Sequence, residues 1–390
     1  MELSTLSTHQ TPFYYYNMEL LAQTLQSCSA EAKKYNFHVH YALKANANPE
    51  ILKSIVNAGF GADCVSGNEV LRAKENGFAN TQIVFAGVGK SDQEINDALD
   101  ADISCFNVES KQELEVLNEL AAAKNKIASI ALRINPNVNA HTHHYITTGL
   151  EENKFGINHW ELEKVIELLG VYKNIKLVGL HFHIGSQITD MSVFKSLCLK
   201  VNEFVSWFED RKQHIRIINV GGGLGIDYVN PEEHAISDFE AYFKLFNQFL
   251  TVKNHQEVHF ELGRALVAQC GTLISKVLYI KEGLQTNFTI LDAGMTELLR
   301  PALYQAYHKI ENLSNTNTSE KKKYDVVGPI CESSDCFGKA VELPITKRGD
   351  YIAIRSAGAY GEVMRSGYNL RVANSSVFVP SAPLRDRLSL

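Results

Sequence analysis

The chain has 390 residues, of which 45% are hydrophobic and 21% are charged, as in ordinary globular proteins. A formal net charge of -6 argues against a basic surface for nucleic acid. The polar segment 1–16 does not resemble a signal peptide, and no run of about 18 apolar residues indicates a membrane span. Seven cysteines, an odd number, favour a reduced cytoplasmic setting over a set of disulfides.

Short apolar runs alternate with helical patterns over the first two thirds of the chain. Most runs are rich in β-branched or aromatic residues, as buried parallel strands are. Between them, Ser66 and Gly77 look like a helix cap and a helix stop, and 108–124 and 191–212 carry apolar residues at helical spacing. This alternation predicts an α/β fold with a (β/α)8 barrel over 18–262. The runs are 40–43, 60–62, 83–86, 103–106, 130–134, 177–183, 217–220 and 258–260.

Beyond Gly263 the pattern changes to strands separated by turn signals, at 272–280, 288–291, 324–327, 351–354 and 376–380. Such a pattern predicts a mainly antiparallel, β-sandwich-like domain over 263–390. The segment 13–16 also reads as a strand, so we expect 1–17 to add a strand to this domain. The polar segment 311–323 is predicted to be a flexible loop.

Residues with chemical potential follow the apolar runs at their carboxyl ends, where barrel enzymes place their active sites. Lys44 would be partly buried, which lowers the pKa of a lysine and frees its amine for covalent chemistry; the alternative is a lysine that reaches solvent. Glu261 can keep the ring nitrogen of a cofactor protonated, or form a surface salt bridge with Arg264. The glycines of 221–225 can admit a phosphate or form a tight turn.

Two histidines, His181 and His183, share one strand face, and metal binding is one reading of them. Further candidate ligands would be His141, His143 and His144. No carboxylate or cysteine lies nearby at metal spacing, so we expect no metal. The alternative is a histidine stacked on a cofactor ring.

Cys331 and Glu332 follow a Gly-Pro-Ile turn, which favours a reactive thiol. Cys331 with Cys336 would form only a weak metal pattern, because no second cysteine pair accompanies them.

Ten motifs in order resemble those of the fold-type-III pyridoxal-phosphate (PLP) decarboxylases and span nearly the whole chain. Two positions depart from the family pattern: Leu262 replaces the usual proline, and Thr296 stands where asparagine is frequent. Neither change removes a residue on which the site depends. The motifs are 41–46, 133–136, 148–149 with 154–156, 183–187, 221–225, 261–264, 292–295, 299–304, 328–333 and 358–360.

The resemblance implies pyridoxal 5'-phosphate as the cofactor, with Lys44 carrying it and Cys331 acting as the catalytic acid. It implies that other residues contact the cofactor, namely Asp63, His183, Ser186, Gly222, Gly223, Glu261, Gly263, Arg264 and Tyr360. It implies a substrate site formed by Arg264, Arg300, Tyr304, Glu332 and Tyr360.

The implied reaction is decarboxylation of meso-2,6-diaminopimelate to L-lysine and CO2, the last step of lysine biosynthesis. Arg264 and Arg300 suit a distal carboxylate, and Glu332 suits the amino group beside it. The resemblance also implies a homodimer whose partner subunit donates Cys331 and Glu332, and a loop over 140–156 that closes the site. The open alternatives are a decarboxylase of ornithine, arginine or carboxynorspermidine, a non-catalytic PLP-binding regulator, and a histidine-site metalloenzyme.

Overall fold

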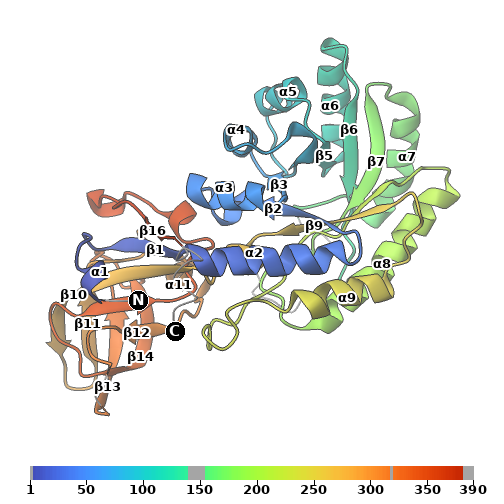
Figure 1. Cartoon of the computed structure of the whole chain (residues 1–390). Helices are drawn as coiled ribbons and strands as arrows, with labels where there is room; N and C mark the ends of the chain where they lie inside the picture. The colour runs from blue at the N-terminus through green and yellow to red at the C-terminus, as the bar shows by residue number, and fades with distance from the viewer. Residues whose placement is uncertain (1–2, 139–153, 317–318, 381–390) are drawn as a thin grey trace. The chain divides into compact units, whose positions relative to one another are not determined.

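The computed structural model describes residues 3–138, 154–316 and 319–380. Its contacts divide the chain into two compact units (Figure 1). One unit comprises 25–225 and 237–263, and the other comprises 1–24, 226–236 and 264–390. Among the described residues, no helix is long and apolar enough to span a bilayer.

The first unit is a closed barrel of parallel strands. Each strand pairs with the next, and the first pairs with the last to close the ring. Every strand overlaps one of the apolar runs, so the predicted (β/α)8 barrel is confirmed. The strands are β2 (His38–Ala42), β3 (Gly61–Cys64), β4 (Ile83–Phe85), β5 (Cys105–Val108), β6 (Ala128–Arg133), β7 (Ile175–His181), β8 (Ile217–Asn219) and β9 (Glu257–Leu262).

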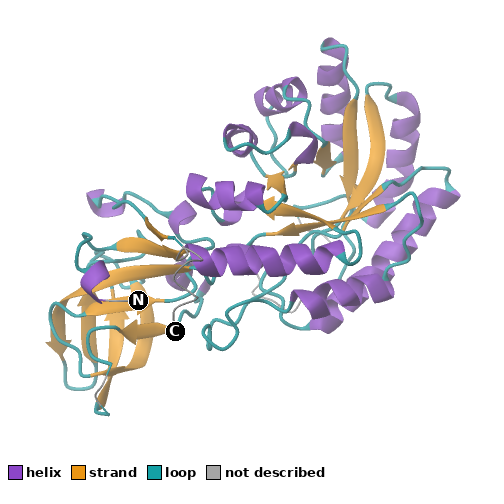
Figure 2. Ribbon diagram, viewed as in Figure 1, coloured by secondary structure: helices purple, strands orange, loops and turns teal. Residues whose placement is uncertain are grey.

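Helices surround these strands (Figure 2) and begin where local chemistry favours a helix start. The Ser66 side chain accepts a hydrogen bond from the Glu69 N–H at 3.2 Å, which confirms the predicted cap. Phe260 of β9 packs edge-on against Phe243 and Phe246, with ring centroids 5.0 Å apart in each pair. The helices are α3 (Pro49–Asn57), α4 (Gly67–Glu75), α5 (Asp92–Asp100), α6 (Lys111–Ala123), α7 (Leu162–Val171), α8 (Met191–Asp210) and α9 (Phe239–Phe249).

The second unit is built on a mainly antiparallel sheet, which confirms the predicted β domain. Its core includes Leu6, Phe13, Ile274 and Ala353. The sheet path is β12 (Ile310–Asn312), β15 (Tyr351–Ile354), β10 (Gly271–Glu282), β11 (Asn287–Leu291), β13 (Lys321–Val327) and β14 (Cys336–Pro344). β1 (Phe13–Asn17) pairs with β10 and with β16 (Val377–Val379).

One prediction for this unit was wrong in part, because 311–323 is not entirely loop. β12 includes Glu311 and Asn312, and β13 begins at Lys321. Three short helices complete the assignment: α1 (Leu3–Leu6), α10 (Arg264–Val267) and α11 (Arg300–Tyr304). Helix α2 (Met18–Lys33) contributes residues to both units.

Candidate active site

The residues expected at the active-site end of the barrel follow the carboxyl ends of its strands. Lys44 lies in a 3-10 turn directly after β2 and is half-buried. Asp63 lies near the end of β3 and Glu261 near the end of β9, and both are buried. The other predicted residues of this unit lie in the segments after β7, β8 and β9: His183, Ser186, Gly222, Gly223 and Gly263. The fold therefore gathers them at the end where barrel enzymes carry their chemistry.

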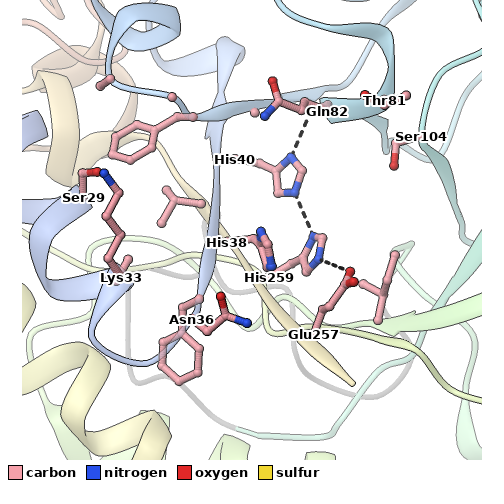
Figure 3. Close-up of a pocket in the computed structure, with 18 of the residues that line it drawn as sticks. Ser29, Lys33, Asn36, His38, His40, Thr81, Gln82, Ser104, Glu257 and His259 are labelled. Atoms are coloured by element: carbon pink, nitrogen blue, oxygen red, sulfur yellow. Dashed lines mark hydrogen bonds and ion pairs between the residues drawn. The ribbon is translucent and has the colours of Figure 1, made fainter. Parts of the chain in front are cut away.

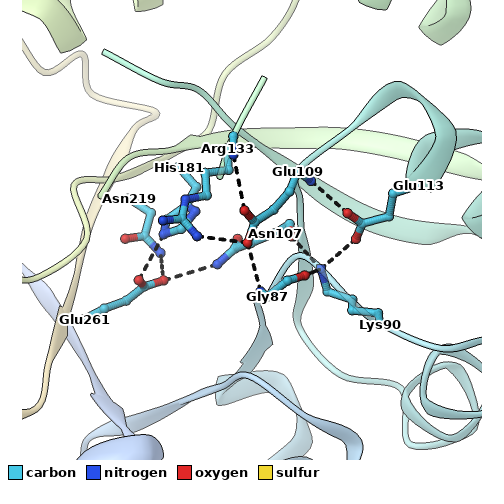
Figure 4. A network of polar contacts seen from close by, with 10 residues as sticks. Gly87, Lys90, Asn107, Glu109, Glu113, Arg133, His181, Asn219 and Glu261 are labelled. Carbon is cyan, nitrogen blue, oxygen red and sulfur yellow. Dashed lines mark hydrogen bonds and ion pairs between the residues drawn. The ribbon is translucent and has the colours of Figure 1, made fainter. Parts of the chain in front are cut away.

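Glu261 is the centre of a buried hydrogen-bond network (Figure 4). His181 Nε2 lies 2.9 Å from one carboxylate oxygen, and the amides of Asn107 and Asn219 donate to the other at 3.1 and 2.8 Å. Burial is the largest influence and would raise the pKa, yet the charge and hydrogen bond of His181 help to hold the Glu261 pKa well below its ordinary value. Glu261 therefore keeps its negative charge, as the partner of a protonated ring nitrogen must.

This environment disfavours the charged forms of both Asp63 and His183. Burial, and then repulsion from Glu261, raise the pKa of Asp63 well above its ordinary value, which favours its protonated form. Its Oδ1 is buried and has no hydrogen-bond partner in the described part of the chain. Burial, and then the charges of Lys44 and Arg133, lower the pKa of His183 well below 6.5. The His183 imidazole is therefore neutral, which suits a ring that stacks on another ring.

A glycine turn follows β8 and packs closely against the neighbouring strand ends. Asn219 fixes the turn, because its Oδ1 accepts from the Gly221 N–H at 2.9 Å while its amide donates to Glu261. A Cβ on Gly222 would overlap the Glu261 carbonyl oxygen, and Gly223 has a φ of +109°, which other residues rarely adopt. The loop after β7 donates a backbone hydrogen bond to the Gly223 carbonyl at 2.8 Å. The Gly222 N–H donates to His183 Nδ1 at 3.4 Å, and the three glycines have no side chains that would keep a phosphate away from the backbone of the turn.

A buried ion pair anchors the neighbouring strand ends. Arg133 Nη1 lies 2.8 Å from Glu109, whose carboxylate also accepts from the N–H groups of Gly87 at 3.0 Å and Gly156 at 3.2 Å. The Arg133 guanidinium lies 4.7 Å from the centroid of the Phe155 ring. The pair thus holds the end of the predicted closing segment 140–156 against β5 and β6. The part 140–153 of that segment lies outside the described residues.

Three residues that position Glu261 were not assigned a site role from the sequence. Asn107 lies within the apolar strand β5 and Asn219 ends the apolar strand β8, and both are buried. A buried amide needs hydrogen-bond partners, so an asparagine within an apolar strand was an available signal. His181 was considered as a metal ligand or a stacked ring, whereas the structure shows it bonded to Glu261.

The second unit holds two buried arginines around one tyrosine. Arg264 donates to the Tyr228 hydroxyl at 2.6 Å, and its guanidinium lies 4.9 Å from the centroid of the Tyr360 ring. The Arg300 guanidinium lies 5.0 Å from the Tyr228 ring centroid, and its Nη1 lies 2.7 Å from His308 Nε2. Among the described residues, no carboxylate forms an ion pair with Arg300. A buried guanidinium lacking an anion suits the anionic group of a ligand.

His308 sets the direction of Arg300, a role that the sequence did not indicate. His308 Nδ1 lies 2.8 Å from the Arg355 carbonyl oxygen, so Nδ1 carries the proton and Nε2 accepts from Arg300. Burial, and then the charge of Arg300, lower the His308 pKa to about 3, which keeps the ring a neutral acceptor. Arg300 also begins α11, and Tyr304, another predicted substrate residue, ends it.

Cys331 and Glu332 occupy an exposed turn. The buried Asp335 carboxylate shapes this turn by accepting from the N–H groups of Ile330 at 2.7 Å and Met295 at 2.6 Å. Glu332 accepts from the Ser334 hydroxyl at 3.1 Å.

Known proteins share this combination of a barrel and a second unit. The family model for "Pyridoxal-dependent decarboxylase, pyridoxal binding domain" matches residues 21–268. A diaminopimelate decarboxylase of Bacteroides thetaiotaomicron is 59% identical over 365 residues, which are 93% of this chain and 94% of that protein.

Two crystal structures of diaminopimelate decarboxylase with bound L-lysine are also similar. The protein from Helicobacter pylori has 39% identity and a TM-score of 0.89, covering 95% of this chain and 92% of that one. The protein from M. jannaschii has 37% identity and a TM-score of 0.88, covering 96% and 88%. The chain therefore belongs to the diaminopimelate decarboxylase family of pyridoxal-dependent decarboxylases.

The cofactor of this enzyme is PLP, and the residues present fit it. PLP offers a ring nitrogen, an aldehyde and a phosphate. The barrel offers an ionised buried carboxylate at Glu261, a half-buried amine at Lys44 and a glycine turn after β8. The buried Oδ1 of Asp63, which has no partner among the described residues, marks a further polar position at the same end of the barrel.

Proposed function

We propose that this chain decarboxylates meso-2,6-diaminopimelate to L-lysine and CO2, the final step of lysine biosynthesis. The observation that carries the substrate assignment is the arginine pair, Arg264 and Arg300, which shares Tyr228 and in which Arg300 has no carboxylate partner within 3–138, 154–316 and 319–380. A substrate with an amino acid at each end supplies the missing anion. Diaminopimelate decarboxylases at up to 59% identity support the same substrate.

On the cofactor side, the proposed roles match the charge or the backbone geometry of each residue. Lys44 carries the cofactor, and Glu261 holds the ring nitrogen in its protonated form. His183 would stack on the ring as a neutral imidazole, and Asp63 would support either Lys44 or the ring. The residues that would hold the phosphate are the glycine turn with Ser186, the backbone at Gly263 and Arg264, and the Tyr360 hydroxyl.

On the substrate side, the residues orient one bond for cleavage. Arg264, Arg300 and Tyr304 bind the distal carboxylate, with Tyr360 beside them, and Glu332 binds the distal amino group. The bond from the α-carbon to the reacting carboxyl carbon breaks, and CO2 leaves without the bonding electrons; bound PLP supplies the electron sink. The Cys331 thiol then donates its proton to the α-carbon.

The test is lysine formation by the purified holoenzyme from meso-diaminopimelate, compared with ornithine, arginine and carboxynorspermidine. We expect CO2 release and lysine formation from diaminopimelate to exceed turnover of the other compounds. Preference for one of them would move the assignment to another diamino acid. No CO2 from any of them, with PLP bound, would favour the non-catalytic regulator.

We further propose a homodimer in which each active site takes Cys331 and Glu332 from the partner subunit. Both residues are exposed in the single chain, and Asn369 accepts from the Cys331 N–H at 3.2 Å. Large apolar side chains are exposed beside that contact, including Leu370 at 93% and Val372 at 83%. An apolar patch next to a catalytic turn fits a subunit interface.

Subunit complementation tests this arrangement. Lys44→Ala and Cys331→Ala each remove one proposed catalytic group, so each homodimer should have at most a trace of activity. Co-expression in equal amounts should restore about a quarter of wild-type activity, because half of randomly formed dimers are hybrids with one intact site. The control is a chain with both substitutions, co-expressed with either single variant, which should restore nothing. Failure of the two single variants to complement would place Cys331 in the site of its own chain.

We propose a cytoplasmic location, which rests on the thiols. All seven cysteines are free, and five of them are buried. Thiols in this state fit a reducing compartment. Fractionation of cells that express the native chain, followed by a decarboxylase assay, checks the location.

A further inference from the structure

The amino-terminal end of the barrel, opposite Lys44 and Glu261 along the strands, contains a pocket of about 720 Å³ (Figure 3). The first residues of β2, β8 and β9 line it, together with the loops that precede these strands. Nothing in the decarboxylation chemistry uses this end. The sequence expectation of no metal rested on other histidines.

Three potential ligands meet in this pocket. His38, Glu257 and His259 each place one ligand atom within 4.8 Å of the others. His38 pairs with His259 across the parallel β2–β9 ladder, and their ring centroids lie 4.8 Å apart. Glu257 precedes His259 by two residues on β9, so both side chains lie on one face of the strand. Backbone register therefore brings the three groups together.

A relay of hydrogen bonds fixes the proton positions on the buried rings. His40 Nδ1 lies 3.2 Å from the Gln82 carbonyl oxygen, which can only accept, so this nitrogen carries the proton. His40 Nε2 must then accept from His259 Nδ1, at 2.9 Å. His259 Nε2 is left with a lone pair, and it faces Glu257 Oε2 at 3.4 Å. A cation bound between this lone pair and the carboxylate would satisfy both groups (Figure 3).

The donor set specifies the kind of cation. Two imidazole nitrogens and one carboxylate oxygen form the His2Glu set that zinc and similar divalent metals accept, with a further position open to water. Calcium and magnesium prefer oxygen ligands. The surrounding contacts also fit, because His40 holds the His259 ring in the ligating tautomer and Arg216 holds Glu257 at 2.8 Å.

We propose that His38, Glu257 and His259 bind a divalent transition-metal ion of the zinc class. β2 and β9 are the first and last strands of the barrel, and their ladder closes the ring. A metal bound to His38 and His259 crosslinks this seam between segments far apart in the sequence. Its effect is on barrel stability, because a ligand that binds the folded state stabilises that state.

The experiment uses the full-length, tag-free holoenzyme, freed of metal with EDTA and titrated with Zn²⁺ against a chromophoric chelator. We expect one Zn²⁺ per chain and a higher midpoint of thermal unfolding with Zn²⁺. Co²⁺ in place of Zn²⁺ should give the visible absorption of a site with a low coordination number. His38→Ala should weaken Zn²⁺ binding by at least about tenfold and abolish the thermal shift, because a ligand is lost. His38 is exposed, so this variant should fold, and its PLP absorbance should be unchanged.

The matched control is His255→Ala. His255 is also exposed and stacks on His214 with ring centroids 4.6 Å apart, two residues before Glu257. Its removal should leave Zn²⁺ affinity unchanged, while Glu257→Gln should weaken it. Equal affinity in the wild type and His38→Ala, or loss of binding in His255→Ala alone, would overturn the assignment. A proton would then bridge His259 and Glu257.

Discussion

Each unit holds a buried charged group, Glu261 in the barrel and Arg300 in the second unit, and the two groups differ in how many partners the chain itself supplies. In the barrel, the Glu261 carboxylate has donors on both oxygens, supplied by His181, Asn107 and Asn219. In the second unit, the Arg300 guanidinium is held by a neutral histidine and a tyrosine ring, and among the described residues it has no anion. We infer that the chain itself stabilises the charged group that faces a resident cofactor, whereas a substrate that binds and leaves brings the missing charge with it.

Removal of the Glu261 charge should have the largest effect. Glu261→Gln keeps the shape of the side chain but removes the charge that holds the ring nitrogen protonated. We expect kcat to fall about 10³-fold, comparable to the loss of a preorganised electrostatic contact. Steady-state kinetics with measured PLP content checks this. The control is Glu203→Gln on the exposed surface of α8, which should retain full activity.

Removal of the Arg300 charge should affect substrate binding more than the chemical step. Arg300→Met keeps much of the side-chain length and removes the cation. We expect kcat/KM for diaminopimelate to fall by at least about 30-fold, the lower end of the 2–5 kcal/mol lost when a buried charge pair loses one partner. PLP content should stay at the wild-type level. An unchanged KM would show that Arg300 does not contact the substrate.

Substitution of His308 should have a smaller effect than substitution of Arg300, because His308 acts only through Arg300. His308→Ala removes one hydrogen bond, so we expect KM to rise about three- to tenfold with kcat nearly unchanged. His308→Gln supplies another acceptor and should restore most of the affinity. Since the His308 pKa is about 3, its ring does not titrate between roughly pH 5 and 9, and the KM effect should be constant over that range. A KM ratio that varies steeply with pH would contradict the neutral-acceptor role.

The smallest effect concerns stability alone. The pKa of Asp63 is raised in the folded chain, so folded Asp63 keeps a proton that the unfolded chain releases above about pH 4. Its contribution to stability is fully present below that pH and is lost as pH rises toward the folded pKa. Asp63→Asn removes the free-energy cost of keeping Asp63 buried at pH 7, so the cofactor-free variant should be more stable than the wild type at that pH. Urea unfolding at pH 7 and pH 4.5 should show the difference shrinking at the lower pH.

The sequence predicted the barrel well because its signal is local. Each apolar run was long enough to identify a strand, and the residues at its carboxyl end fell at one rim once the ring closed. The partners of Glu261 were harder to find, because Asn107, His181 and Asn219 lie on three different strands, and only barrel closure brings them together.

The second unit shows the limits of local signals. β12 (Ile310–Asn312) is short and polar, and it forms through pairing with β15 rather than through its own apolar pattern. The contact between His308 and Arg300 likewise depends on how the chain leaves α11, where Gln305 adopts a left-handed conformation with φ of 52°. Neither is visible in residue spacing.

Asn219 has a consequence for any attempt to retune this enzyme. One amide group touches both the carboxylate of Glu261 and the backbone of Gly221, so it links the proposed ring-nitrogen and phosphate anchors. Redesign of either anchor through this position would disturb the other. A designer who wants a cofactor with a different tail would therefore begin at the loop after β7 and leave the last residue of β8 alone.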